Sequence, residues 1–186
     1  MTPSQRKWAV LAAFLVLIGG GTVFFFRVTS RAEAPPAPKK PATIQDNPDH
    51  ELKELTVQLQ KKPGHFPVLM RMAQIEHDQG KLPEAEAHLR EAVASEPARA
   101  DVHLELGRVL YERGNQDEAI KETEQALTID PKFVDALYNM GAIYANAGYT
   151  EKPRSYWERA LAADPASDSG RKARDGLAKL RGGGSK

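Results

Sequence analysis

The sequence of 186 residues contains no cysteine. Disulfides, thiol catalysis and cysteine-containing metal sites are therefore excluded, although a chain without cysteine suits both reducing and oxidising compartments. The chain also lacks an excess of charge of either sign, since its net charge is +1. Residues 49–186 hold 20 Lys and Arg against 23 Asp and Glu, a balance of −3. This part of the chain shows no basic character that would indicate nucleic-acid binding.

A long apolar run is the first feature that is present. Nineteen uncharged residues, 8–26, stand between Lys7 and Arg27. At about 1.5 Å per residue, a helix of this length spans the roughly 30 Å core of a bilayer. We interpret residues 1–7 as a short tail and residues 8–26 as an uncleaved transmembrane anchor. A cleaved signal peptide is the alternative, because Ala32 and Ala34 resemble the small residues of a cleavage site, but the apolar run is long for one.

Residues 27–48 are rich in proline and poor in large apolar residues, so they cannot build a packed core. They predict an extended linker, and at about 3.1 Å per residue the stretch 30–49 could hold the following domain up to roughly 60 Å from the bilayer. Basic residues flank both ends of the apolar run, so the positive-inside rule is nearly balanced. We predict that the chain crosses the inner (cytoplasmic) membrane once and places its domain on the periplasmic, extracytoplasmic side.

From residue 60 onward the sequence repeats itself every 34 residues. Three kinds of residue keep this period without slipping, namely Pro63, Pro97, Pro131 and Pro165, then Gly80, Gly114 and Gly148, then Ala92, Ala126 and Ala160. A fixed period of this length indicates a repeat architecture, in which each unit buries its apolar face against the next.

The third unit carries the most complete pattern, with Leu137, Met140, Gly141, Tyr144, Gly148, Trp157, Ala160, Leu161 and Pro165. This pattern resembles the tetratricopeptide repeat (TPR), a 34-residue helix–turn–helix unit. The resemblance implies an all-α fold, an α-solenoid of three TPR helical hairpins with flanking capping helices, after the N-terminal transmembrane helix. The predicted segments are a cap helix at 49–62, TPR 1 at 66–99, TPR 2 at 100–133, TPR 3 at 134–167, a C-terminal cap helix at 168–181 and a disordered tail at 182–186.

Pro153 stands where the two earlier units carry alanine, in a segment that the repeat predicts to be helical. If Thr150 caps this helix, Pro153 is about its third residue, and the first four N–H groups of a helix have no partner inside it. We therefore predict a helix start rather than a break, with Pro153 opposite Gly141. In the second unit we expect Asp117 to cap the corresponding helix.

The resemblance also implies a binding surface, because the first helices of successive TPR units line a concave face. The residues nominated there are Met70, Gln74, His77, Leu104, Arg108, Tyr111, Tyr138, Asn139 and Asn146. Their mixture of apolar, aromatic and hydrogen-bonding side chains suits a peptide segment. A subset of the family binds the C-terminal carboxylate of chaperones through Lys and Asn at fixed positions. Two of those positions hold Glu105 and Asp135 here, which argues against that class of partner.

Signs of catalysis and of metal binding are missing. The histidines show no HxxH or HxxxH spacing, and the glycine triplets lie in the apolar run and the tail. We therefore expect no enzyme activity, no cofactor and no metal ion. His103 occupies a position that usually holds a large packing residue, so we expect it in a contact between helices. His88 follows Glu84 by four residues, which predicts an exposed pair on one helix.

The layout resembles single-pass bacterial membrane proteins with a periplasmic TPR domain. Relatives of that layout serve cytochrome c maturation, the protein-export translocon or the assembly of envelope machines, and the layout does not choose among them. We expect a membrane-anchored scaffold or adaptor that binds protein or peptide partners on its concave face. The alternative is a structural subunit of a larger membrane complex that exchanges no peptide ligand.

Overall fold

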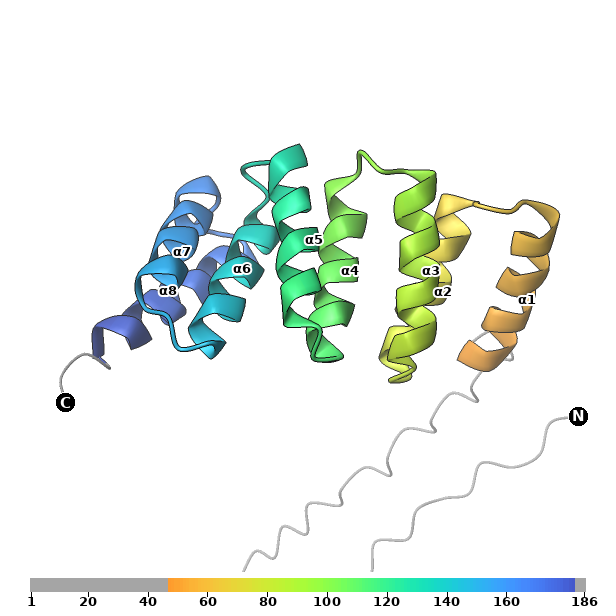
Figure 1. The fold of residues 1–186 in the computed structure, drawn as a ribbon, viewed down its shortest axis with the longest axis horizontal. Coiled ribbons are helices and arrows are strands. Elements are labelled where there is room, and N and C mark those ends of the chain that lie inside the picture. Colours follow the sequence, from red (N-terminus) through yellow and green to blue (C-terminus); the bar gives the residue numbers. More distant parts are fainter. Residues whose placement is uncertain (1–46, 183–186) are drawn as a thin grey trace, which may run out of the picture. The chain divides into compact units, whose positions relative to one another are not determined.

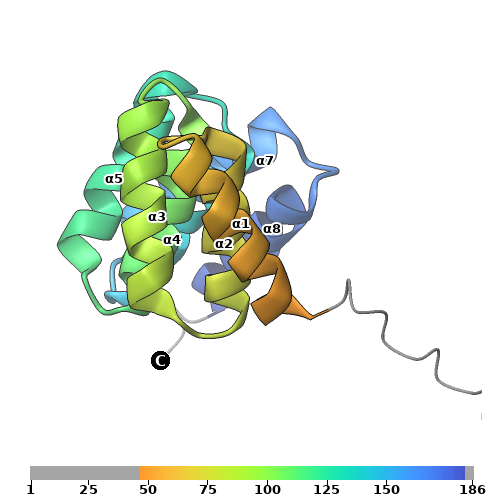
Figure 2. The same cartoon turned by 90° about the vertical axis from the view of Figure 1, so that its right-hand side faces the viewer.

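The computed structural model describes residues 47–182, and these form a row of eight α-helices (Figure 1). Figure 2 looks along this row with the first helix in front. The helices are α1 (Pro48–Lys61), α2 (Phe66–Asp78), α3 (Leu82–Ser95), α4 (Ala100–Glu112), α5 (Gln116–Ile129), α6 (Val134–Asn146), α7 (Glu151–Ala163) and α8 (Asp168–Gly182). The all-helical class predicted from the sequence is confirmed for this part of the chain.

The predicted anchor, residues 8–26, lies outside the described residues, as do the tail 1–7 and nearly all of the linker. Among α1 to α8, none has both the length and the apolar content that a membrane span requires. Gly182, which the sequence assigned to the tail, is the last residue of α8.

Three helical hairpins fill the middle of the row, because α2 packs on α3, α4 on α5, and α6 on α7. The turn of each hairpin contains a glycine with positive φ, and the angles are 73° at Gly80, 86° at Gly114 and 85° at Gly148. At Gly114 the amide N–H donates to the Tyr111 carbonyl at 2.9 Å, and the Asn115 N–H donates to the Leu110 carbonyl at 2.9 Å. These two bonds satisfy the last carbonyls of α4 in a left-handed C-cap, as predicted.

The second helix of each hairpin tolerates a proline only near its start. Pro153 is the third residue of α7, and Thr150 precedes the helix as its N-cap residue, so the predicted helix start is confirmed. The prediction for the second hairpin is wrong by two residues. α5 begins at Gln116 after Asn115, and Asp117 lies inside its first turn. A carboxylate there interacts favourably with the positive end of the helix dipole.

In the second and third hairpins, the first helix packs closely on the second helix at a glycine. A Cβ atom on Gly107 would lie 2.7 Å from the Thr123 hydroxyl oxygen and 3.1 Å from the Ala119 carbonyl oxygen. A Cβ atom on Gly141 would lie 2.5 Å from Cδ1 of Trp157. Gly141 therefore faces Trp157 rather than Pro153, which corrects the sequence-based expectation. The indole fills the space that a smaller residue, Thr123, fills in the second hairpin.

Trp157 is also the contact through which α8 joins the array. A Cβ atom on Gly176 of α8 would lie 2.7 Å from Cζ3 of Trp157, so the indole lies between two glycines on different helices. The indole N–H donates to the Tyr138 carbonyl at 3.1 Å, which satisfies its only polar atom. Ala173 and Leu177 of α8 are buried in the same cluster. At the other end, Leu55 of α1 packs against Val68 and neighbouring residues of α2.

His103 lies in the core of the second hairpin, where the first and third hairpins carry Leu69 and Leu137. Its Nδ1 is 2.7 Å from a carboxylate oxygen of Glu122 on α5, and its Nε2 is 3.0 Å from the Pro97 carbonyl oxygen. The predicted contact between helices is confirmed. The prediction for His88 is wrong, because its Nδ1 is 2.7 Å from a carboxylate oxygen of Glu76 on α2, and its side chain is half-buried.

An ion network links the first hairpin to the second. Glu86 of α3, whose side chain is 11% exposed, contacts Arg113 just after α4 and accepts a 2.8 Å hydrogen bond from Arg90. Arg90 also donates to Glu118 of α5 at 2.6 Å. Burial raises the pKa of Glu86, but the hydrogen bonds from Arg90 and Arg113 outweigh it and hold the pKa below its ordinary value.

Gly141→Ala tests the packing around Trp157. Alanine is the better helix former by about 1 kcal/mol, but the added methyl overlaps the indole, and such overpacking costs about 1–3 kcal/mol. We expect a lower free energy of unfolding in urea denaturation of the full chain. Gly182→Ala is the control, because a Cβ there meets no atom within 4 Å. A Gly141→Ala protein as stable as the wild type would contradict this packing.

Glu86→Gln tests the ion network through its pH dependence. Because the pKa of Glu86 is lowered in the fold, its carboxylate stabilises the protein above about pH 4.3 and loses this effect as the pH falls through the folded pKa. At pH 7 we expect the variant to be about 1–2 kcal/mol less stable. The difference should shrink toward pH 3. Glu91→Gln, at an exposed position of α3, should show neither effect.

Candidate functional site

The surface nominated from the sequence is formed by α2, α4 and α6, the first helices of the three hairpins. We call their exposed and half-buried residues the first-helix face. Eight of the nine nominated side chains lie on this face. Leu104 does not, because it is only 3% exposed and packs against Ala126 and Ala136. Its nomination is corrected, since a side chain within the core cannot contact a partner.

Hydrogen bonds connect each first helix to the next through the same pair of repeat positions. His77 of α2 lies 3.0 Å from a carboxylate oxygen of Glu112 on α4. One repeat later, Asn146 of α6 donates from Nδ2 to the Tyr111 hydroxyl at 2.8 Å. Three nominated residues, His77, Tyr111 and Asn146, therefore already hold neighbouring repeats in register at one edge of the face.

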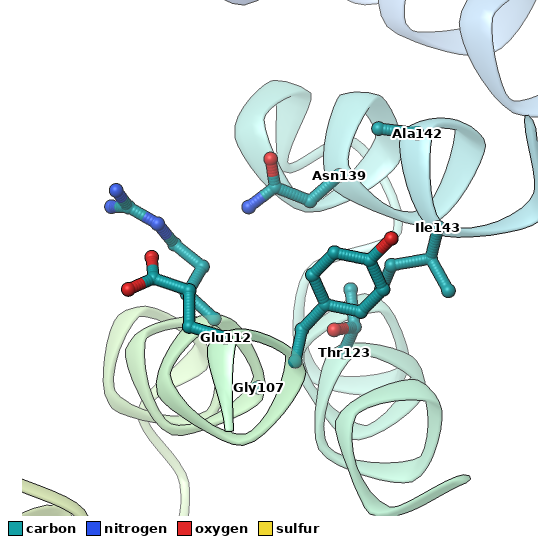
Figure 3. A pocket seen from close by; sticks show the side chains of 8 residues that line it. Gly107, Glu112, Thr123, Asn139, Ala142 and Ile143 are labelled. Carbon is teal, nitrogen blue, oxygen red and sulfur yellow. The ribbon is translucent and has the colours of Figure 1, made fainter. Parts of the chain in front are cut away.

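A pocket of about 180 Å³ opens on the first-helix face between α4 and α6. In Figure 3, Asn139 and Ile143 of α6 face Glu112 of α4 and Thr123 of α5 across it. Its full lining is Gly107, Arg108, Tyr111, Glu112, Thr123, Asn139, Ala142 and Ile143. Cavities of roughly 150 Å³ hold one benzene-sized group, so this pocket fits a single apolar side chain of a ligand.

Gly107 takes part in the lining of this pocket. The same small residue that lets α4 approach α5 lines the pocket floor together with Thr123. Arg108, Tyr111 and Asn139 supply a cation, an aromatic ring and an amide. The sequence thus nominated three lining residues that the fold brings together. It did not single out Thr123, because that residue belongs to a second helix.

A second cavity, of about 510 Å³, lies one repeat further along, between α6 and α8. We call it the α8 groove, and its lining is Tyr138, Ala142, Ala145, Asn146, Trp157, Lys172, Asp175, Gly176, Lys179 and Leu180. Adding 34 to Arg108, Tyr111, Glu112 and Thr123 of the first pocket gives Ala142, Ala145, Asn146 and Trp157. The α8 groove is therefore the same site between repeats, repeated once along the chain.

α8 takes the place that the first helix of a fourth repeat would occupy. Lys172 corresponds to Tyr138 by the 34-residue period, and Lys179 corresponds to Ala145. Neither lysine was predicted from the sequence to line a site, because α8 was interpreted only as a cap. The period would have found them if it had been extended past Pro165.

The arginines of the first-helix face form ion pairs with carboxylates of the same chain. Arg108 donates to Glu105 at 3.0 Å. Arg71 donates to Glu51 of α1 at 2.6 Å, and this hydrogen bond holds the pKa of Glu51 below its ordinary value. Within residues 47–182, by contrast, no ion pair involves Lys172 or Lys179.

The remaining nominated residues occupy the ends of the face. Met70 is half-buried against the core of the first hairpin, and Gln74 is exposed and donates to Asp78 at 2.9 Å. Tyr138 stacks on Trp157 with 6.5 Å between ring centroids. No group of three or more His, Asp or Glu residues within 47–182 is arranged to hold a metal ion, and the expected lack of a metal or cofactor stays a prediction.

Comparison with known protein families gives three matches to the same repeat. Two family models described as tetratricopeptide repeat match residues 76–125 and 134–167, and one described as TPR repeat matches residues 107–148. None of the curated proteins compared matches the chain. The matched residues cover α3 to α7 and the end of α2, and thus the first pocket.

Several solved structures resemble the fold. The crystal structure of MamA is 20% identical with a TM-score of 0.62, over 73% of this chain and 85% of that chain. A tetratricopeptide repeat protein from Parabacteroides merdae ATCC 43184 is 21% identical with a TM-score of 0.65, over 75% and 55%. The first TPR of Spaghetti (RPAP3), bound to the HSP90 peptide SRMEEVD, is 17% identical with a TM-score of 0.59, over 65% and 94%.

At these identities the structures show a shared fold and nothing further. The family matches, the 34-residue period and the glycine turns nevertheless agree on one repeat. The chain belongs to the tetratricopeptide repeat family, whose members act as protein-interaction scaffolds.

Proposed function

We propose that this protein is an adaptor that binds a segment of a partner protein along the first-helix face. The observation that carries this proposal is the repeated pocket, because two equivalent cavities lie one repeat apart and share Ala142 in their linings. A bound segment that follows the row of helices would place one side chain in each cavity. Aromatic and arginine side chains at the two sites are the residue types that contribute most to protein binding.

The proposal assigns different tasks to the residues of the first pocket. Its volume of about 180 Å³ admits one apolar side chain, while Arg108 and Asn139 at its wall offer hydrogen-bond donors to the ligand backbone. Arg108 already has Glu105 as a partner, but exposed pairs of this kind contribute only about 0–1 kcal/mol. The arginine can therefore turn toward a ligand at little cost.

The cellular setting is a further part of the proposal. The nineteen uncharged residues between Lys7 and Arg27 favour a single membrane anchor, with the repeats held on the extracytoplasmic side by the proline-rich linker. Such an arrangement suits the assembly of an envelope or cytochrome complex. A reporter enzyme fused after Lys186 tests the orientation, because activity restricted to the cytoplasm would contradict it.

Arg108→Ala combined with Asn139→Ala tests the binding face. Both positions line the pocket, and neither side chain belongs to a core cluster, so the fold should be retained by circular dichroism. In affinity capture from detergent extracts with the full chain as bait, we expect at least tenfold less of the specific partner to be recovered. Tyr111→Ala with Tyr138→Ala should have the same effect.

Tyr149→Ala is the matched control, because this tyrosine is 52% exposed and lies in the turn between α6 and α7. It should leave the recovery of the partner unchanged. If all variants recover the partner equally well, binding does not use the first-helix face. A partner that copurifies in fixed stoichiometry and never exchanges would instead favour a structural subunit.

A further inference from the structure

The α8 groove is larger than the first pocket, at about 510 Å³ against about 180 Å³, and it also differs in charge. Its floor is apolar and aromatic, with Tyr138, Trp157 and Leu180, and two lysines of α8 stand at its wall. Lys172 and Lys179 are exposed and are separated by seven residues, which brings them to the same side of the helix two turns apart. The ammonium group of Lys172 lies 5.9 Å from the centre of the Tyr138 ring.

These lysines are not needed to hold α8 in place. The helix docks through Ala173, Gly176 and Leu177 against the Trp157 cluster. Two arginines of α8 have partners in the chain, since Arg171 pairs with Asp168 and Arg174 donates to the Pro165 carbonyl at 3.2 Å. Asp175 also lines the groove, yet it forms no ion pair with either lysine within the described residues.

We propose that the α8 groove is a carboxylate-recognising subsite, occupied by an acidic segment of the partner protein. Lys172 and Lys179 bind the carboxylate, and an apolar side chain next to it packs on Tyr138, Trp157 and Leu180. Charge complementarity carries this assignment, because two lysines and one aspartate leave the groove positively charged. The inference rests on the proposed function and deepens it, since it states what the partner segment must contain.

The positions of the two sites also set the order of the chemical groups along the bound segment. The first pocket admits one apolar side chain between α4 and α6, and the α8 groove lies one repeat further along the row. A segment that uses both sites therefore carries an apolar anchor toward α4 and an acidic group toward α8. The acidic group is either an Asp or Glu side chain or the carboxylate of a chain end, since both offer the same oxygens.

Two random-peptide libraries distinguish these sources. One displays peptides with a free C-terminus and the other embeds them within a carrier protein, and both are selected on the full chain in mild detergent. We expect selected peptides to contain Asp or Glu near an apolar residue. If only the free-end library is enriched, and amidation of those peptides abolishes binding, then the ligand is a terminal carboxylate. Enrichment in both libraries assigns an acidic side chain.

Lys172→Ala combined with Lys179→Ala then tests the contact on synthetic versions of the selected peptides. Fluorescence anisotropy should show about tenfold weaker binding, the loss expected for charge-assisted hydrogen bonds. Neutralising the peptide carboxylate, by Glu→Gln, Asp→Asn or amidation, should weaken binding to the wild type similarly. It should have little further effect on the double variant. Lys53→Ala with Lys61→Ala removes the same charge from exposed positions of α1 and should bind normally.

The failures of the two proposals are distinguishable. Peptides without acidic enrichment, or unchanged affinity of the Lys172→Ala/Lys179→Ala chain, overturn the α8 subsite. If those peptides still lose affinity with Arg108→Ala and Asn139→Ala, the proposed function stands without the subsite. If the wild-type chain selects no peptide from either library, both proposals are overturned.

Discussion

The structure depends on one constraint, which is that the two helices of each hairpin approach closely enough to pack backbone against side chain. Gly107 and Gly141 meet this constraint, since a Cβ atom at either position would overlap the facing helix. Close approach fixes the angle of each hairpin and therefore the spacing of the first helices. Gly107 also lines the pocket between α4 and α6.

The same constraint explains how the array ends and how the α8 groove forms. Trp157 is wide enough to contact Gly141 on one side and Gly176 on the other, so α8 is held where a further repeat would continue. α8 then completes a second cavity with the register of the first. The lysines of α8 lie on a different side of the helix from the residues that pack against Trp157. Positions 172 and 179 therefore do not need the residue types, Tyr138 and Ala145, that the preceding repeat carries there.

Periodicity predicted most of the fold, because the backbone conformations of the turn glycines and of the proline at the start of α7 are determined by local geometry. Gly114 adopts a positive φ and Pro153 lies in the first turn of α7, as the sequence indicated. Contacts between helices were harder to predict. His88 bonds to Glu76 on another helix, and Leu104 points into the core, because the rotation of a helix about its axis is set by packing and not by spacing alone.

The central claim is that partners contact the first-helix face and not the opposite one. Site-specific photocrosslinking in the native cells tests it most directly, with benzoylphenylalanine placed at Asn139 in the pocket or at Gln125, exposed on α5. We expect a discrete crosslinked product from position 139 and none from position 125. Crosslinks from position 125 alone, or equally from both, would contradict it.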